Sequence, residues 1–440
     1  MSRYVPATSA EQQEMLAAIG LRSFDELFSA IPAGMTADKL NIPAGQAELS
    51  VRRRVEGAAG RNKLFRSIFR GGGAYNHYIP ALVKQIASNE TFVTAYTPYQ
   101  AEISQGILQS IFEYQTMMCE LTGLDVSNAS VYDGATAAAE AAAMCLGPKR
   151  NIILVSGAAN PMVIDVIRTY SYGSGAELKI VPAKDGVTDA GALASVLDGA
   201  ACLYVQQPNY FGLIEDAEAL GAAAHEGGAK FVMGVHPIAA AILKSAGESG
   251  ADIAVGDAQP LGMPLSFGGP YLGFMTAVND MARKLPGRIA GETADIDGKR
   301  AFVLTLQARE QHIRREKASS NICSNQALCA LTAAVYLTVM GPSGLADAAR
   351  QCASKAHYAA EKICSVDGFD LVYGGEFFNE FVTSCPAESG ALMKRLGDRG
   401  ILGGLPVDGG ILWCATEMNT KDDIDELVNE LTEALKEAVR

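Results

Sequence analysis

The sequence lacks several patterns that would place the protein in a specialised class. Its nine cysteines are scattered without a CxxC pair, so we expect the reduced thiols of a cytoplasmic protein rather than a disulfide framework. The longest apolar run, residues 327–341, is shorter than the roughly 18 residues of a membrane span and predicts a buried core helix. The opening stretch MSRYVPATSAEQQEM has no apolar signal core, and its two glutamates argue against a transit peptide.

Positive charge is also scarce. Lysine and arginine number 36 against 49 aspartates and glutamates, which gives a net charge of -13. Such a chain repels the phosphates of nucleic acids, so no nucleic-acid partner is expected. The first strand of the central region is not followed by G-x-G-x-x-G and no P-loop occurs, which disfavours a nucleotide site. No metal site is expected.

The chain is long enough for more than one domain. At roughly 150 residues per domain, its 440 residues predict two or three. Between residues 151 and 280, short apolar runs alternate with helical segments, which is typical of βαβ crossovers around a largely parallel sheet. The C-terminal third mixes the strand-like GFDLVYG, NEFVTSCP and GGILWCATE with two helical segments, which predicts a smaller α+β domain. We therefore predict a helical arm (1–65), a large domain (66–320) and a small domain (321–440).

The arm is predicted to be helical from its capping signals. Ser9 with Gln12, and Ser23 with Glu26, have the spacing of capping boxes before apolar-periodic segments. Such an arm has little core of its own. It either wraps a partner or covers the same chain, and the sequence leaves both open.

A glycine- and tyrosine-rich stretch between residues 66 and 100 provides the first candidate site residues. Tyr96, Pro98, Tyr99 and Gln100 follow neither a strand nor a helix period, which favours a shaped loop that lines a pocket. A packed core loop is the alternative.

Two further segments could hold an anion. Asp133, Gly134, Ala135 and Thr136 open a helix, where free backbone N–H groups favour phosphate, although most such helix starts bind nothing. The segment LQAREQHIRREK is rich in cations and could hold an anionic substrate or a partner. Alternatively it is a solvated helix with pairs such as Glu310 with Arg314. Its candidate residues are Arg309, His312, Arg314 and Arg315.

The stretch DIAVGDAQPLGMPLSFGGP has the layout of a strand that delivers a side chain beside a tight glycine turn. A pyridoxal-phosphate enzyme needs a lysine at such a position, because the cofactor aldehyde is held as an imine. Here the residue is Gln259, whose amide cannot form that bond.

The motifs YTPYQAEISQG, EYQTM, NASVYDGATAAAEA, the GGP turn and LQAREQHIRREKASSNIC closely resemble the P-protein family of the glycine cleavage system. Within it they are similar to the N-terminal-half chain, subunit 1, of organisms that split the protein in two. The resemblance spans nearly the whole chain. It implies the aspartate-aminotransferase fold (fold type I of pyridoxal-phosphate enzymes), with a mostly parallel sheet in the large domain.

The resemblance also implies partners. The lysine would lie on subunit 2, in a His-Lys pair where this chain has Ala258-Gln259, and the preceding strand offers no aspartate for the pyridine nitrogen. Subunit 2 would thus bind pyridoxal phosphate and form an α2β2 heterotetramer with this chain, and the aminomethyl group of glycine would pass to lipoylated H-protein. This chain alone would be inactive. Tyr96, Pro98, Tyr99, Gln100, Glu102 and His312 would contribute to the partner's active site.

Two other functions remain open. One is an autonomous pyridoxal-phosphate enzyme that uses another lysine, such as Lys244, which is expected on a helix surface. The other is a structural scaffold without any catalytic contribution.

Overall fold

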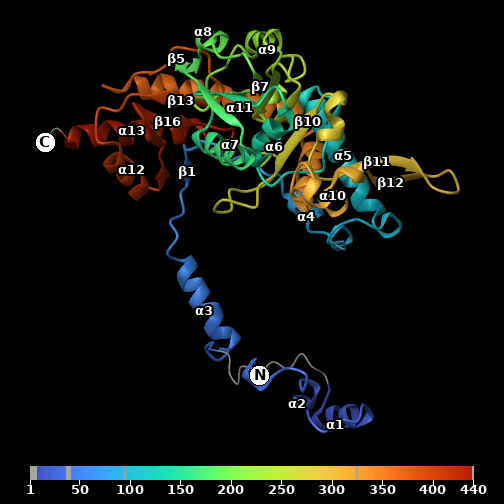
Figure 1. Ribbon diagram of the computed structural model, residues 1–440. Helices are drawn as coiled ribbons and strands as arrows, with labels where there is room; N and C mark the ends of the chain where they lie inside the picture. The colour runs from blue at the N-terminus through green and yellow to red at the C-terminus, as the bar shows by residue number, and fades with distance from the viewer. Residues whose placement is uncertain (1–6, 36–40, 94, 324–325, 439–440) are drawn as a thin grey trace. The chain divides into compact units, whose positions relative to one another are not determined.

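The computed structural model describes residues 7–35, 41–93, 95–323 and 326–438 (Figure 1). The chain divides into two compact units, Met1–Leu64 and Phe65–Arg440. Because the second unit is compact from residue 65 onward, the boundary expected near residue 320 stays a prediction.

The first unit is helical. It contains α1 (Ser9–Ala18), α2 (Phe24–Leu27), the 3-10 turn η1 (Ala33–Met35) and α3 (Glu48–Ala59). The second capping residue is as expected, since the Ser23 hydroxyl accepts a hydrogen bond from the Glu26 N–H. The first is wrong by one position: Thr8 caps α1 and pairs with Glu11, whose carboxylate accepts the Thr8 N–H. Large apolar side chains remain exposed along this unit, including Met15, Ile19, Phe24, Phe28, Leu49 and Val55.

A seven-stranded sheet forms the centre of the second unit, with the strand order β2-β10-β9-β8-β7-β3-β4. The five strands from β9 to β4 run parallel, while β10 and β2 are antiparallel to their neighbours. Their bounds are β2 Val126–Ser127, β3 Ile152–Ser156, β4 Glu177–Val181, β7 Ala200–Gln207, β8 Lys230–Val235, β9 Ile253–Asp257 and β10 Gly273–Ala277. The predicted alternation of strands and helices is confirmed.

Helices cover both faces of this sheet (Figure 1). Side chains of α6 (Gly134–Cys145) and α7 (Pro161–Ser174) pack on one face. Those of α5 (Gln105–Thr122), α9 (Ala217–Glu226) and α11 (Ala327–Cys364) pack on the other. The strands are apolar on both sides because both faces are buried, as in parallel sheets generally.

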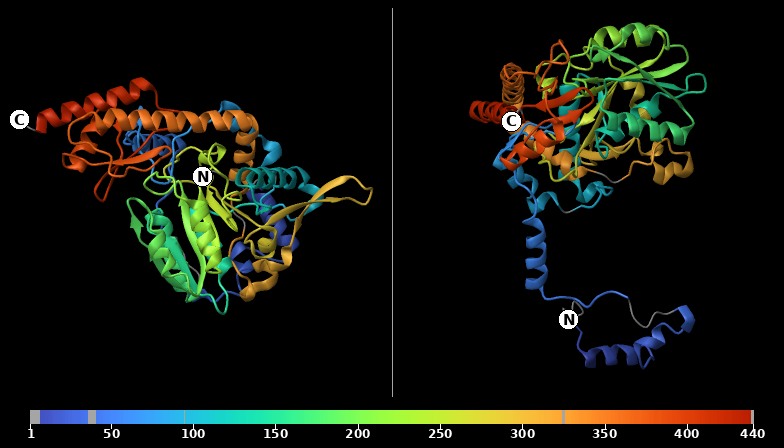
Figure 2. Two further views of the ribbon diagram at one scale, coloured as in Figure 1. Left: turned by 90° about the horizontal axis from the view of Figure 1, so that it is seen from above. Right: turned by 90° about the vertical axis from the view of Figure 1, so that its left-hand side faces the viewer.

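The helix α11 consists of two helices that meet at Gly341, whose φ of 61° and ψ of 177° are not helical. The two halves run in different directions (Figure 2). The first half agrees with the core helix predicted in the apolar run 327–341, and its side chains belong to the core under the sheet. By length and composition alone α11 could cross a membrane, but the apolar core helix of a globular domain meets the same criteria.

A smaller sheet follows α11. The strands β13 (Glu380–Thr383), β16 (Gly410–Cys414) and β15 (Leu405–Val407) pair antiparallel, and α12 (Ser389–Asp398) and α13 (Lys421–Ala438) contribute side chains to the adjoining core. The strand expected in GFDLVYG is wrong, because only Leu371 forms a bridge, to Thr383. That segment starts at Gly368, whose φ of 86° lies outside the region of extended strands.

The remaining elements are short. β1 (Ser67–Ile68) pairs in parallel with β14 (Ile401–Leu402), which joins the start of the second unit to its C-terminal part. The hairpin of β11 (Ile289–Ala294) and β12 (Arg300–Thr305) projects from the body (Figure 2). The others are α4 Ala81–Ala87, η2 Glu90–Phe92, η3 Ala101–Ile103, β5 Ala183–Lys184, β6 Val187–Thr188, α8 Ala190–Ala194, η4 Ala239–Ala241, η5 Asn279–Lys284, η6 Gln307–Arg309, α10 Gln311–Arg314 and η7 Arg315–Lys317.

Candidate functional site

A cavity of about 630 Å³ lies at the carboxyl ends of the parallel strands. Tyr204, Gly234 and Asp257 line it from β7, β8 and β9, and the glycine-rich loop 71–75 and the start of α6 complete the wall. Ligands of open α/β sheets bind at this edge, because the loops after the strands converge there. The cavity is therefore the natural position for a cofactor in this fold.

The start of α6 holds carboxylates where an anion was expected. Oδ1 of Asp133 accepts the N–H of Thr136 at 2.8 Å, and Oδ2 of Asp257 accepts the N–H of Gly134 at 3.1 Å. Burial raises the pKa of Asp257 to about 6. Two of the N–H groups that would bind phosphate thus already donate to acidic groups of the chain. The anion site at Asp133–Thr136 stays a prediction and gains no support from this arrangement.

Gln259 lies two residues beyond β9 but does not line the cavity. Its side chain is 1% exposed. Its Nε2 donates to the carbonyl oxygens of Tyr75 and Met263, at 3.0 and 2.7 Å, and its Oε1 accepts the Tyr75 N–H at 2.9 Å. The amide therefore fastens the glycine-rich loop to the end of the sheet.

His236 follows β8, the strand expected to lack an aspartate. It lines the cavity, and its Nδ1 accepts the N–H groups of Ile238 and Ala239. Burial lowers its pKa to about 3, so the ring is neutral. Its ring packs against Tyr75 with 4.5 Å between centroids.

The tyrosine loop, residues 96–100, lies apart from the residues that line this cavity. Tyr96 is 94% exposed and Tyr99 is 50% exposed. Pro98 is buried, whereas Gln100 and Glu102 are exposed. An exposed loop can act on another chain, whereas the alternative of a packed core loop is wrong for these side chains apart from Pro98.

Tyr99 contacts two basic side chains, Arg288 and His312. Arg288, immediately before β11, donates from Nη2 to the Tyr99 hydroxyl and lies 4.9 Å from the centre of its ring. The His312 ring lies edge-on to Tyr99 at 6.0 Å. Only His312 was predicted here. Arg288 was missed because it is a single arginine in GRIAG without any pattern around it.

The predicted arginines separate in space. The guanidinium of Arg309 turns inward and donates to the Leu285 carbonyl, and burial lowers its pKa. Arg314 and Arg315 are exposed. The expected pairing of Arg314 with Glu310 is replaced by a hydrogen bond from Arg314 Nε to the Ala308 carbonyl at 3.3 Å. Arg309 is thus engaged within the chain, and the anion or interface contacts expected of the three arginines stay a prediction.

Comparison with known proteins identifies the family. The profile of the family described as "Glycine cleavage system P-protein" matches residues 2–431. The chain belongs to the P-protein family. A protein of Moorella thermoacetica named "Probable glycine dehydrogenase (decarboxylating) subunit 1" is 50% identical over 435 residues, which are 97% of this chain and 98% of that protein.

Solved structures agree with the P-protein assignment. A crystal structure of glycine decarboxylase (P-protein) of the glycine cleavage system, in inhibitor-bound form, matches with a TM-score of 0.93 and 40% identity, covering 98% of this chain and 99% of that one. An aspartate aminotransferase of Thermus thermophilus matches with a TM-score of 0.58 and 15% identity over 84% of this chain and 99% of that one, which shows the fold alone. The expected fold class is confirmed.

The lysine considered for an autonomous pyridoxal-phosphate enzyme is placed differently from the prediction. Lys244 lies beyond η4 rather than on a helix, because only Ala239–Ala241 turn helically in that segment. Its side chain is 51% exposed and pairs with Glu218. Lys244 does not line the cavity.

Proposed function

We propose that this chain is the subunit of the P-protein that does not hold pyridoxal phosphate, and that it acts in glycine decarboxylation by completing the active site of a lysine-bearing partner subunit. The observation that carries this proposal is the chemistry of its own cavity. In the part of the chain that the structure describes, no lysine or arginine lines that cavity, while Asp133 and Asp257 do.

Pyridoxal phosphate does not fit these residues. Its phosphate would meet the carboxylates of Asp133 and Asp257 at the start of α6, where the N–H groups are already engaged. Its aldehyde would find a glutamine amide that is buried and bonded to Tyr75 and Met263. The ring nitrogen would meet neutral His236 instead of an aspartate. These mismatches support the proposal that the partner subunit holds the cofactor.

The partners follow from the family. We infer that the second subunit of the P-protein carries the lysine and forms an α2β2 heterotetramer with this chain, and that glycine and lipoylated H-protein are the substrates of the complex. The relatives' designation as subunit 1 supports the existence of such a partner. The cytoplasmic location expected from the cysteines belongs to the same proposal.

The contribution to the partner's site would come from the tyrosine loop and its surroundings. Arg288 holds the Tyr99 hydroxyl and covers one face of its ring, so the ring is fixed before a partner binds. Exposed Tyr96, Gln100, Glu102 and His312 lie on or beside this loop. An exposed but preorganised group can contact a neighbouring active site at low entropic cost.

Cofactor trapping tests the first part of the proposal. The isolated chain and the complex are incubated with pyridoxal phosphate and reduced with borohydride, and the modified peptide is identified by mass spectrometry. We expect the adduct on a lysine of the partner. A stoichiometric adduct on one lysine of this chain, with a spectral change on addition of glycine, would overturn the proposal in favour of an autonomous enzyme.

Variants of the loop test the second part. Tyr99→Phe removes the hydroxyl that Arg288 contacts and should reduce glycine-dependent exchange of carbon dioxide by about tenfold, equivalent to the loss of one charge-assisted hydrogen bond of roughly 1.5 kcal/mol. Tyr99→Ala should reduce it further. Tyr172→Ala is the matched control, because Tyr172 is 91% exposed on α7. Unchanged exchange in Tyr99→Ala and Tyr96→Ala, with the complex intact, would reduce this chain to a scaffold.

A further inference from the structure

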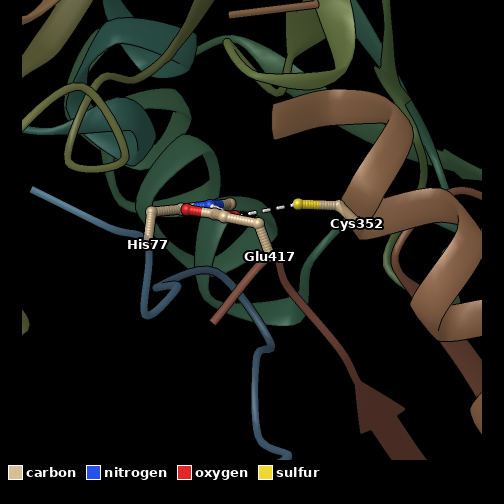
Figure 3. A group of neighbouring side chains, drawn as sticks. All are labelled: His77, Cys352 and Glu417. Atoms are coloured by element: carbon tan, nitrogen blue, oxygen red, sulfur yellow. Dashed lines mark hydrogen bonds and ion pairs between the residues drawn. The ribbon is translucent and has the colours of Figure 1, made fainter. Parts of the chain in front are cut away.

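Three potential metal ligands from distant parts of the sequence meet at one point of the second unit (Figure 3). His77 precedes α4, Cys352 lies in the second half of α11, and Glu417 follows β16. Their ligand atoms all lie within 4.8 Å of one another. None of the three lines the cavity described above.

The contacts within this cluster are short. Nδ1 of His77 lies 2.8 Å from Oε2 of Glu417, and the Cys352 thiol donates to the same oxygen at 3.1 Å. His77 is 5% exposed, and Cys352 is fully buried. Figure 3 shows the imidazole and the thiol directed at the carboxylate from different sides. Two potential ligand atoms thus contact one carboxylate oxygen, and a cation could bind all three in place of these contacts.

We propose that His77, Cys352 and Glu417 bind one divalent metal ion of the zinc class. Thiolate, imidazole and carboxylate are the three ligand types that zinc accepts in tetrahedral sites. A thiolate and a carboxylate together carry two negative charges, which neutralise a divalent ion in a buried position.

The proton balance of binding is simple. The metal forms a bond to Cys352 Sγ, which releases the thiol proton to solvent, and a bond to the carboxylate, which has no proton to lose. The imidazole binds through Nδ1, so its proton must reside on Nε2, an atom without a hydrogen-bond partner in the described part of the chain. One proton is released for each metal ion, and no atom changes its oxidation state.

Neighbouring groups support the carboxylate ligand. Oε1 of Glu417 accepts the N–H of Tyr78 at 2.6 Å, and Lys355 Nζ donates to the Glu417 carbonyl at 2.6 Å. Such outer contacts orient metal ligands in proteins. The Glu417 side chain is 14% exposed, which leaves a route for the ion and for a water molecule as the fourth ligand.

The ion would connect three elements. His77 lies two residues after Tyr75, in the segment that continues the cavity's glycine-rich loop, and the other two ligands lie on α11 and beside the small sheet. A metal there would fix this loop against the C-terminal part of the unit. The inference is independent of the role proposed for the partner subunit.

The experiment uses the full chain after dialysis against a chelator, with Co²⁺ as the probe because a cobalt–thiolate bond gives a strong near-ultraviolet charge-transfer band. We expect one Co²⁺ per chain with this band, competed by Zn²⁺, and a higher melting temperature with either ion. Cys352→Ser should abolish the band, and Glu417→Gln should weaken binding by more than about 100-fold. Cys364→Ser, near the end of the same helix and only partly buried, is the matched control and should keep the band.

Metal binding by the wild-type chain tests the proposal even where a variant fails to fold. A wild-type chain that binds no stoichiometric Co²⁺ or Zn²⁺ would overturn the proposal and leave a hydrogen-bonded cluster. A thiolate band that persists in folded Cys352→Ser, or disappears in Cys364→Ser, would also overturn it, because the thiolate would then belong to another cysteine.

Discussion

Gln259, the residue expected in place of a cofactor-binding lysine, has a structural task in this chain. Its three hydrogen bonds satisfy backbone groups of Tyr75 and Met263 that are far apart in the sequence. A buried backbone group that loses its partner costs roughly 1 to 3 kcal/mol. The amide therefore contributes to stability and cannot form an imine.

Gln259→Ala is predicted to destabilise the chain by about 3 kcal/mol, because it leaves those groups unpaired and opens a cavity. The free energy of unfolding in urea measures this effect. Gln85→Ala, at an exposed position of α4, is the control and should change it by less than about 0.5 kcal/mol. Equal stabilities of the two variants would contradict the anchoring role of Gln259.

Glu380 is a second residue whose environment sets its chemistry. It is buried on β13, its Oε2 accepts the Tyr75 hydroxyl at 2.7 Å and its Oε1 accepts the Gly72 N–H at 2.6 Å. Burial raises its pKa to about 7, although the two hydrogen bonds act in the opposite direction and lower the pKa. Tyr210 and the Cys414 thiol face the same charge.

The raised pKa of Glu380 predicts a pH dependence of stability. Because the folded chain holds this proton more tightly than the unfolded chain does, the contribution is complete below about pH 4.5 and is lost as the pH rises through about 7. A shift of this size corresponds to about 3 kcal/mol. Urea unfolding of the wild type and Glu380→Gln between pH 5 and 8 should show the steeper decline in the wild type. Parallel pH profiles would refute this assignment.

At the scale of elements, Gly341 determines the course of α11. Its φ of 61° with ψ of 177° is a conformation that side chains with a Cβ avoid, and Pro342 starts the second half. Nothing lies within 4 Å of a Cβ added at Gly341, so the restriction comes from the backbone alone. The bend changes the direction of the second half, whose first turns still pack in the core under the large sheet and bring Cys352 to Glu417.

Substitution of two neighbouring glycines should have opposite effects. Gly341→Ala is predicted to cost about 1 to 3 kcal/mol through backbone strain. Gly344→Ala, inside the second half, meets only ordinary contacts with Met340 and should stabilise the chain by up to about 1 kcal/mol. Chemical unfolding of both variants gives the comparison. A neutral Gly341→Ala would mean that the bend tolerates other conformations.

At the scale of the whole molecule, the unit Met1–Leu64 contrasts with the rest of the chain. Its helix α3 buries none of its residues, and α2 buries none. A helix with exposed apolar side chains gains stability only when another surface covers them. Whether a partner or another part of the same chain covers the arm stays a prediction.

Removal of residues 1–64 is predicted to leave residues 65–440 folded but to weaken assembly with the second P-protein subunit, since obligate interfaces commonly bury more than about 2,000 Å². Sedimentation of the co-expressed pair should give one species with the full chain and two with the truncated chain at micromolar concentration. Full-length Phe28→Ser replaces one exposed apolar side chain of the arm, so it tests whether apolar contacts of the arm contribute to assembly. Undiminished assembly of the truncated chain would show that the arm is dispensable.

Local patterns in the sequence determined much of the fold. The alternation of apolar runs and helices, the start of α6 at Asp133 and the end of α5 before Gly123 each depend on residues a few positions apart. The absence of a lysine at Gln259 could be read in the same way. The strand expected in GFDLVYG and the helix expected at Lys244 are wrong, since short apolar stretches do not show whether a partner strand or a full helical turn is available.

Only the tertiary structure decided which side chains meet. The contact of Tyr99 with Arg288 joins residues 189 positions apart, and that of Tyr75 with Gln259 joins residues 184 apart. The cluster of His77 with Glu417 spans 340 positions. Helix and strand periods describe neighbours along the chain, whereas these contacts depend on the packing of the sheet, α11 and the small sheet. The sequence alone therefore determined the family's fold and the glutamine at position 259, and packing determined the surroundings of Tyr99 and the proposed metal site.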